Sequence, residues 1–227
     1  MKKKSLNLSE ARNSYLMPYI AVMTILCIFF MIQYSNYSRE IAEKEADKKR
    51  NMAQDVREDL KELENVEVEV IEDGIKVTLP SSLMFDKSVA GIKPAVLSTL
   101  KNLSESIKKL NEEYLVVVDG HTDDEPVFYG GDFSSNWELS LYRSMSVIDF
   151  FVREGNNPDL FAAAGHGEFS PVFPNDTPSH KAANRRVEIF IRKKSKAQKT
   201  LKELLPAGLK PEKTAETEKN EPDKILM

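Results

Sequence analysis

The sequence predicts an α+β protein in which a single N-terminal transmembrane helix carries one mixed domain. Three observations support this fold class. A run of residues near the start contains no charged side chain, residues 66–79 alternate apolar and polar side chains on both sides of a turn, and apolar runs typical of strands then alternate with segments of helical periodicity. Of the 227 residues, 41% are hydrophobic and 30% are charged, which leaves room for one ordinary domain beside the anchor.

The charge-free run, residues 15–34, is long enough to cross the hydrocarbon core of a bilayer as a helix and has aromatic residues at both ends. It is longer than the apolar part of a secretory signal, and no small-x-small cleavage pattern follows it, so we expect an uncleaved anchor. The basic residues on its two sides do not decide its orientation. Cys27, the only cysteine, lies inside the run and is expected to be a small apolar residue.

Residues 36–65 are strongly charged and contain neither proline nor glycine. Acidic residues that stand four positions before basic ones predict a helical linker. A short apolar seam runs through it at a spacing of three to four residues: Met52 or Ala53, Val56, Leu60 and Leu63. The pattern favours a solvated helical spacer. The alternatives are a dimerising seam and a plug-like helix, and a seam this short cannot establish a coiled coil.

Residues 66–192 are expected to form the folded domain. Two alternating runs, Val66–Val70 and Ile75–Leu79, flank Asp73-Gly74, which predicts a hairpin with Asp-Gly as its turn. A helix is expected after Pro94, because apolar residues recur there at helical spacing and can pack on a sheet: Val96, Leu97, Leu100, Leu103, Ile107 and Leu110. Further strands are expected at residues 115–118, 161–165 and 187–191, so the helices should cover one face of a mixed sheet.

The strand at residues 115–118 ends at Asp119-Gly120 and delivers Thr122 and Asp123 to its end. After a polar loop, Ser134-Ser135-Asn136 predict the start of a helix that carries Arg143 on its second turn. A carboxylate fixed at a strand end, facing a guanidinium on the next helix, can bind a group that carries both an ammonium and a carboxylate.

Several motifs in this region together resemble the OmpA-like peptidoglycan-binding domains: GHTD at residues 120–123, N-x-x-L-S-x-x-R from Asn136 to Arg143, and NRRVEI at residues 184–189. With its longer loop, the segment from about Leu79 to Arg192 is similar to the flagellar stator B subunits, the MotB family. The resemblance implies an OmpA-like βαβαβ sandwich. It also implies that Asp123 and Arg143 hold the carboxylate and ammonium of the diaminopimelate in the stem peptide. The remaining candidate peptidoglycan-binding residues are Thr122, Leu139, Asn184, Arg185 and Arg186.

The resemblance further implies a membrane-anchored protein that tethers a membrane complex to the cell wall. Residues 1–14 are then cytoplasmic, residues 15–34 cross the inner membrane, and residues 66–192 lie in the periplasm. A homodimer and a MotA-like multi-span membrane partner are implied as well. In stator B subunits an aspartate in the span carries the ion, but this position is Ala21 here. We therefore expect a tether without ion conduction of its own; the alternative is an active flagellar motor stator subunit with ion-driven torque.

Other classes of function are disfavoured. The spacing of His121, His166 and His180 does not match that of metal ligands, and we expect neither a metal nor a cofactor. No nucleophile stands with a base, which argues against an enzyme. The net charge of −4 argues against a nucleic-acid binder. Trp137, the only tryptophan, is expected either to stack on a sugar or to lie in the core. Residues 193–227 have the composition of a disordered tail.

Overall fold

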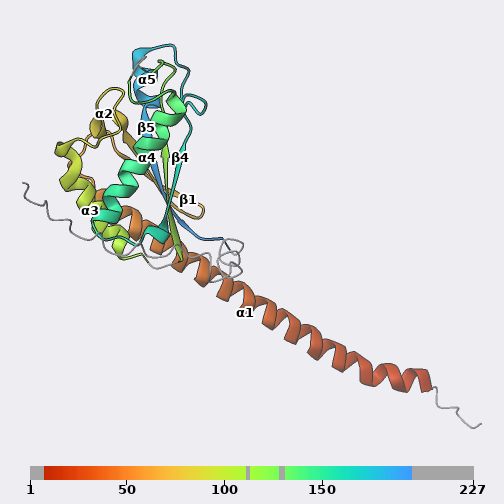
Figure 1. Cartoon of the computed structure of the whole chain (residues 1–227). Helices are drawn as coiled ribbons and strands as arrows, with labels where there is room; N and C mark the ends of the chain where they lie inside the picture. The colour runs from red at the N-terminus through yellow and green to blue at the C-terminus, as the bar shows by residue number, and fades with distance from the viewer. Residues whose placement is uncertain (1–7, 111–112, 128–130, 196–227) are drawn as a thin grey trace, which may run out of the picture.

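The computed structural model describes residues 8–110, 113–127 and 131–195. It confirms the α+β fold: a long helix leads into a five-stranded sheet that helices cover on one face (Figure 1). Most of the predicted disordered tail, from residue 196 on, lies outside the described residues, as do residues 1–7 of the predicted cytoplasmic segment.

The first element, α1 (Leu8–Asp59), is one continuous helix of 52 residues that joins the predicted span to the charged segment. Within the described chain it is the one helix that is long and apolar enough to cross a membrane. Its apolar side chains from Leu16 to Tyr37 are exposed, and this part extends away from the domain (Figure 1). Among the described residues none covers that apolar surface, which leaves it free to contact the lipid of a bilayer.

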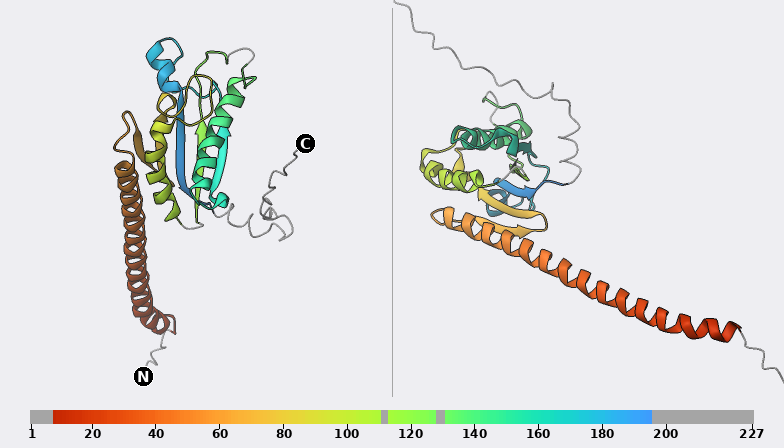
Figure 2. Two further views of the ribbon diagram at one scale, coloured as in Figure 1. Left: turned by 60° about the vertical axis from the view of Figure 1, so that its left-hand side comes forward. Right: turned by 90° about the horizontal axis from the view of Figure 1, so that it is seen from below.

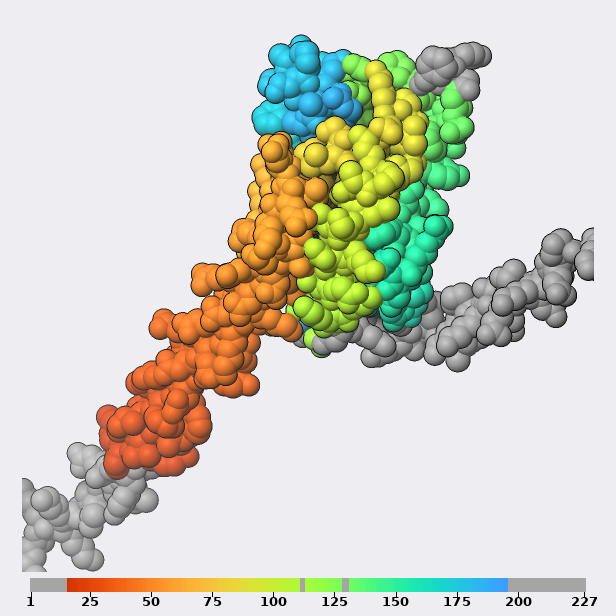
Figure 3. Space-filling view, turned by 90° about the vertical axis from the view of Figure 1, so that its left-hand side faces the viewer, coloured from red at the N-terminus to blue at the C-terminus, as the bar shows by residue number. Residues whose placement is uncertain are grey.

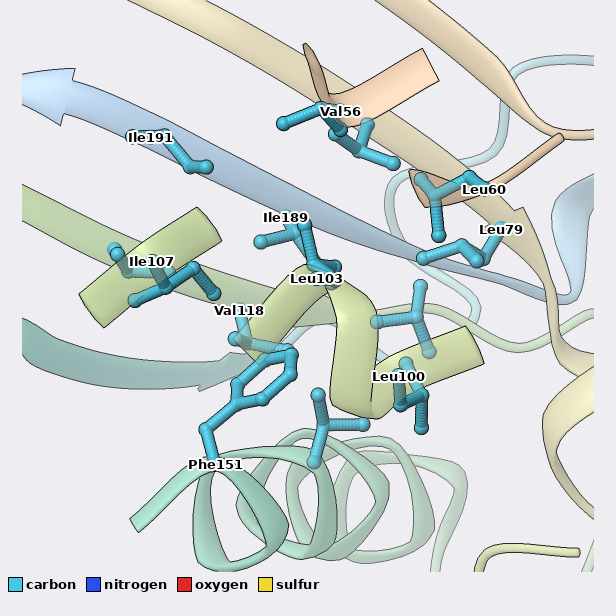
Figure 4. Close-up of a cluster of buried hydrophobic side chains, with 14 of the residues drawn as sticks. Val56, Leu60, Leu79, Leu100, Leu103, Ile107, Val118, Phe151, Ile189 and Ile191 are labelled. Carbon is cyan, nitrogen blue, oxygen red and sulfur yellow. The ribbon is translucent and has the colours of Figure 1, made fainter. Parts of the chain in front are cut away.

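The last turns of α1 pack into the domain, whereas the sequence favoured a solvated spacer. Ala53, Val56 and Leu60 are at most 2% exposed and belong to the same core cluster as the apolar residues of the sheet (Figure 4). Nη2 of Arg57 donates a hydrogen bond of 2.6 Å to the carbonyl oxygen of Val68. The apolar seam is thus buried within its own chain, and it cannot pair with a second helix while this packing holds.

Five strands form one sheet in the order β1-β2-β5-β3-β4. They are β1 (Glu67–Ile71), β2 (Gly74–Pro80), β3 (Tyr114–Gly120), β4 (Phe161–Gly165) and β5 (Arg186–Lys193). β3 and β4 are parallel, and the other neighbouring pairs are antiparallel. The apolar residues that point from β2, β3 and β5 into the core are buried: Ile75, Val77, Leu79, Val116, Val118, Val187, Ile189 and Ile191.

The predicted hairpin is present, but Asp-Gly is not its turn. Ile71 pairs with Gly74, so Glu72 and Asp73 make the turn and Gly74 is the first residue of β2. The glycine is needed for close approach, because a Cβ atom at Gly74 would lie 1.8 Å from the carbonyl oxygen of Ile191 on β5.

The helices after the hairpin are α2 (Ser81–Met84), η1 (Pro94–Val96), α3 (Leu97–Lys108), α4 (Asn136–Arg153), η2 (Pro158–Leu160) and α5 (Pro178–Asn184). The end of α1, α3 and α4 lie across one face of the sheet (Figures 2 and 3). Ser135 caps α4 as predicted, its hydroxyl accepting from the backbone N–H of Glu138. The sequence analysis missed α5, although Thr177 caps it and Pro178 stands at its first position.

Candidate ligand-binding site

The end of β3 is held tightly between α4 and the loop after β4. Gly120 touches the backbone of α4, where a Cβ atom would lie 2.1 Å from the carbonyl oxygen of Ser140. Two residues on, the backbone N–H of Thr122 donates to the carbonyl oxygen of Gly167 over 2.9 Å. These contacts fix the direction in which the chain leaves the strand, and they bring Asp123 to the start of α4.

A cavity of about 390 Å³ opens at this end of the sheet. Five of the seven predicted binding residues line it: Thr122, Asp123, Leu139, Arg143 and Arg185. The opposite wall comes from the segment that follows β2, which includes Ser81, Ser82, Phe85, Asp86, Lys87 and Lys93. Figure 3 shows this segment, residues 81–93, in yellow above α3 and next to the blue segment that contains α5.

Asp123 is 4% exposed, and its carboxylate is paired directly with Arg185 rather than with Arg143. Oδ2 of Asp123 accepts from Nη1 of Arg185, and Oδ1 accepts from the backbone N–H of Glu125 over 3.2 Å. Nδ2 of Asn136 donates to the carbonyl oxygens of Asp123 and Glu125. The carboxylate is therefore held in one orientation at the wall of the cavity.

Arg143 is 5% exposed and joins α4 to the opposite wall. Its Nε donates to the carbonyl oxygen of Val89 over 2.9 Å, and its Nη2 donates to that of Asp86 over 3.0 Å. Burial, with a smaller contribution from Arg185 and opposed by Asp123, lowers the pKa of Arg143 to about 10. The guanidinium is still charged at neutral pH, so it both positions residues 85–93 and contributes a fixed positive charge to the cavity.

The other two predicted binding residues, Asn184 and Arg186, do not line the cavity. Oδ1 of Asn184 accepts from the backbone N–H groups of Val172 and Phe173, at 2.9 and 3.0 Å. Arg186 pairs with Glu188, its Nε lying 2.8 Å from Oε1. Both side chains support the loop before α5 and the start of β5, and of the NRR motif it is Arg185 that reaches the cavity.

No binding role was expected for residues 81–93, because no spacing rule connects this segment with α4, which lies far along the chain. The contact is made through Arg143, so it became visible only in the folded chain. At the rim, Lys87 pairs with Glu125 over 3.1 Å and Lys93 pairs with Asp86 over 3.2 Å.

His121 and His166 stack beside the cavity, with ring centroids 4.7 Å apart. Nε2 of His166 lies 3.2 Å from Oδ2 of Asp119, and Nε2 of His121 lies 3.6 Å from Oε2 of Glu188. Within the described residues, no group of three or more His, Cys, Asp or Glu side chains is arranged to hold a metal ion.

Glu188 should stabilise the fold down to low pH. Burial acts to raise the pKa of Glu188, but the His121 ring and Arg186 outweigh it and hold the pKa at about 2, against an ordinary 4.5. A lowered carboxyl pKa stabilises the folded state above the unfolded pKa, and this contribution disappears as the pH falls from about 4.5 to about 2. We expect Glu188→Gln to cost on the order of 2 kcal/mol at pH 7.

The measurement is urea unfolding at several pH values between 7 and 2.5. It uses a fragment of residues 45–195, which contains the sheet and the part of α1 that packs on it, and the Glu188→Gln variant of this fragment. The difference in unfolding free energy should shrink toward the acidic end. A difference that stays constant across this range would contradict the assignment of the stabilisation to an ionised Glu188.

Comparisons with known proteins agree with this geometry. Residues 84–185 match the OmpA family. Motility protein B of Bacillus subtilis is 32% identical over 136 residues, which cover 58% of this chain and 50% of that protein. The crystal structure of a MotB-like protein from Desulfovibrio vulgaris aligns with a TM-score of 0.62 and 27% identity, over 69% of this chain and 98% of that one.

A third relative is the cell wall anchor of the T6SS from Pseudomonas aeruginosa, whose structure aligns with a TM-score of 0.55 and 28% identity, over 61% of this chain and 95% of that one. The chain spans about half the length of the curated motility proteins that it matches. The OmpA-family match includes β3, β4, α3, α4 and most of the residues that line the cavity. Residues 84–185 therefore form a domain that matches the OmpA family, and over this region the chain is similar to MotB-like proteins.

Proposed function

We propose that the domain binds peptidoglycan through this cavity, that α1 anchors it in the cytoplasmic membrane, and that the protein thereby tethers a membrane complex to the cell wall. The observation that carries the proposal is the charged cavity itself. One carboxylate, Asp123, and two guanidiniums, Arg143 and Arg185, are fixed around the same space. The similar fold of the cell wall anchor of the T6SS from Pseudomonas aeruginosa supports a function at the cell wall.

The diaminopimelate of a stem peptide ends in a carbon that carries both an ammonium and a carboxylate. In our proposal Asp123 binds the ammonium, and Arg143 and Arg185 bind the carboxylate. Two further groups suit a polar ligand. Ser81 and Thr122 line the cavity, and their hydroxyl oxygens are buried without a hydrogen-bond partner among the described residues. A bound ligand would satisfy them, and buried polar groups normally have partners.

The packing of α1 sets how far the domain stands from the membrane. Residues 35–44 separate the apolar span from Glu45, which pairs with Lys193 of the domain, and they cover about 15 Å at ~1.5 Å per residue. The domain would therefore be held by a helical stalk on the periplasmic side, with the N-terminus of the chain in the cytoplasm. This orientation follows from the proposed ligand, because the cell wall lies outside the cytoplasmic membrane.

We also propose that the span conducts no ions by itself, because Ala21 occupies the position where stator B subunits carry an aspartate. The one described side-chain hydrogen bond near it is neutral: Oγ1 of Thr24 donates to the carbonyl oxygen of Ala21 over 2.8 Å. The curated relatives named Motility protein B favour a second candidate, an ion-driven flagellar stator subunit. In either case we propose a homodimer with a MotA-like multi-span partner, and no enzymatic activity.

The test of wall binding is sedimentation of the full-length protein, in detergent, with purified peptidoglycan sacculi. Asp123→Ala and Arg185→Ala should each weaken binding by about 30- to 150-fold, which corresponds to ~2–3 kcal/mol for the loss of a charged hydrogen-bonded partner. Arg143→Ala is a less direct probe, because the same side chain holds residues 85–93. Asp149→Ala, an exposed acid on α4 that pairs with Arg153, is the matched control. Unchanged sedimentation of both cavity variants would show that the ligand binds elsewhere.

A further inference from the structure

Beside the cavity, two aromatic side chains form an exposed stacked pair, which we call the aromatic platform: Trp137 and Phe169. Trp137 stands on the first turn of α4 and is 50% exposed, and Phe169, in the loop after β4, is 63% exposed. Their ring centroids are 5.3 Å apart and the rings are inclined by 27°. Trp137 is therefore not a core residue. Two large aromatic rings that stack in the open, instead of being buried, are typical of a contact surface.

The platform is held in place by the backbone beneath it. Gly167 has a φ of +53°, which favours glycine, and a Cβ atom there would lie 3.2 Å from the backbone nitrogen of Trp137. The N–H of Gly167 donates to Oγ of Ser140 over 3.0 Å. The loop thus lies directly against the first turns of α4, and Phe169 follows two residues later at a fixed place beside Trp137.

The same backbone connects the platform to the cavity. Nδ2 of Asn136, the neighbour of Trp137, donates both to the carbonyl oxygen of Asp123 and to Oε2 of Glu168, the neighbour of Phe169. The carbonyl oxygen of Gly167 accepts from the backbone N–H of Thr122, which lines the cavity. Asn136 itself lines the cavity, so the cavity and the platform meet at the same end of α4.

We infer that the aromatic platform contacts the glycan strand of peptidoglycan while the stem peptide occupies the cavity. This inference rests on the proposed function. Each residue of an extended peptide spans ~3.3–3.6 Å, so a stem peptide held by its third residue keeps its sugar within about 10 Å of the cavity, near the helix end that carries the platform. N-acetylated sugars offer C–H faces and acetyl methyl groups, which pack on aromatic rings without needing a charged partner.

The test uses the full-length protein in detergent and two separate probes: glycan strands from which an amidase has removed the peptides, and a free stem peptide that contains diaminopimelate. Trp137 is the only tryptophan, so its fluorescence reports on the platform alone. Glycan strands should shift this emission in a saturable way. By calorimetry, Trp137→Ala and Phe169→Ala should each weaken glycan binding by about tenfold and leave stem-peptide binding unchanged.

Asp123→Ala should show the reverse pattern, with stem-peptide binding lost and glycan binding retained. Met145→Ala is the matched control, because Met145 is also exposed on α4 (48%) but lies two turns beyond Trp137. The inference is overturned if glycan strands bind the parent no better than the two platform variants. It is also overturned if those variants lose self-association instead, since a second copy would then cover the platform. If the parent protein does not bind the stem peptide at all, that result overturns the proposed function and leaves the glycan inference to be judged by its own test.

Discussion

A fragment that begins at Val66 should be about 3–6 kcal/mol less stable than one that begins at Glu45, although both contain every strand of the sheet. The shorter fragment lacks Ala53, Val56 and Leu60, which are at most 2% exposed. Burying one Val or Leu side chain contributes ~1.5–3 kcal/mol. Because domains are stable by only ~5–15 kcal/mol, this loss would bring the shorter fragment close to unfolding at room temperature.

Polar contacts add to the loss. The hydroxyl of Ser106 on α3 donates to Oδ2 of Asp59 over 2.5 Å, and Nζ of Lys193 at the end of β5 lies 2.9 Å from Oε1 of Glu45. Both contacts disappear when the chain begins at Val66. The measurement is urea unfolding of the two fragments, followed by circular dichroism.

A point substitution separates the effect of the lost packing from the effect of shortening the chain. Leu60→Ala in fragment 45–195 should cost ~2–5 kcal/mol, whereas Glu58→Ala, an exposed neighbour on the same turns, should cost little. Equal unfolding midpoints for the fragments that begin at Val66 and at Glu45 would contradict the assignment of these turns to the core.

This packing bears on the role of the charged segment. A spacer that is free in solution would let the domain move relative to its anchor, but α1 enters the core as one unbroken helix. Movement of the domain away from the membrane then requires α1 to bend or to detach from the core. Detachment would release the seam of Val56 and Leu60, and its cost is the stability difference predicted above.

Local patterns predicted the elements whose residues carry their own signals. The β-branched run before Gly120 predicted β3, and Ser135 predicted the start of α4, because strand propensity and capping depend on near neighbours. The seam of Val56 and Leu60 was also visible. Periodicity shows that a helix has an apolar face, but it does not say what covers that face, and here the partner is α3 and the sheet.

The sequence could predict those residues of the site that lie close to the end of a strand or the start of a helix. Asp123 and Arg143 both reach the cavity. Their partners within the protein were not predicted: Arg185 pairs with the carboxylate of Asp123, and backbone carbonyl oxygens accept from Arg143. Which of several guanidiniums pairs with one carboxylate depends on distances of about an ångström, and the sequence does not contain them. The aromatic platform likewise depends on a loop that crosses the end of α4.

The second large effect concerns ion flux. Together with a MotA-like partner in vesicles, the parent protein should show no proton or sodium flux above that of the partner alone. Ion transfer through a span requires a group that can be charged in one state and neutral in another, at a depth where the gradient acts on it. The sequence has no Asp or Glu between Glu10 and Glu40, and the hydroxyl of Thr24 is engaged by the carbonyl oxygen of Ala21.

Ala21→Asp supplies the missing carboxylate at the one position where the resemblance places it, so this variant should show flux if the partner provides the rest of the path. Ala21→Asn is the matched control, since it has similar size and polarity but cannot be charged. The proposal that the span conducts no ions is wrong if the parent protein itself shows flux and Thr24→Ala abolishes that flux. A silent parent, whatever Ala21→Asp does, agrees with a tether, because a chain without a carboxylate in its membrane helix can hold a complex to the wall but has no group there that can carry the ion.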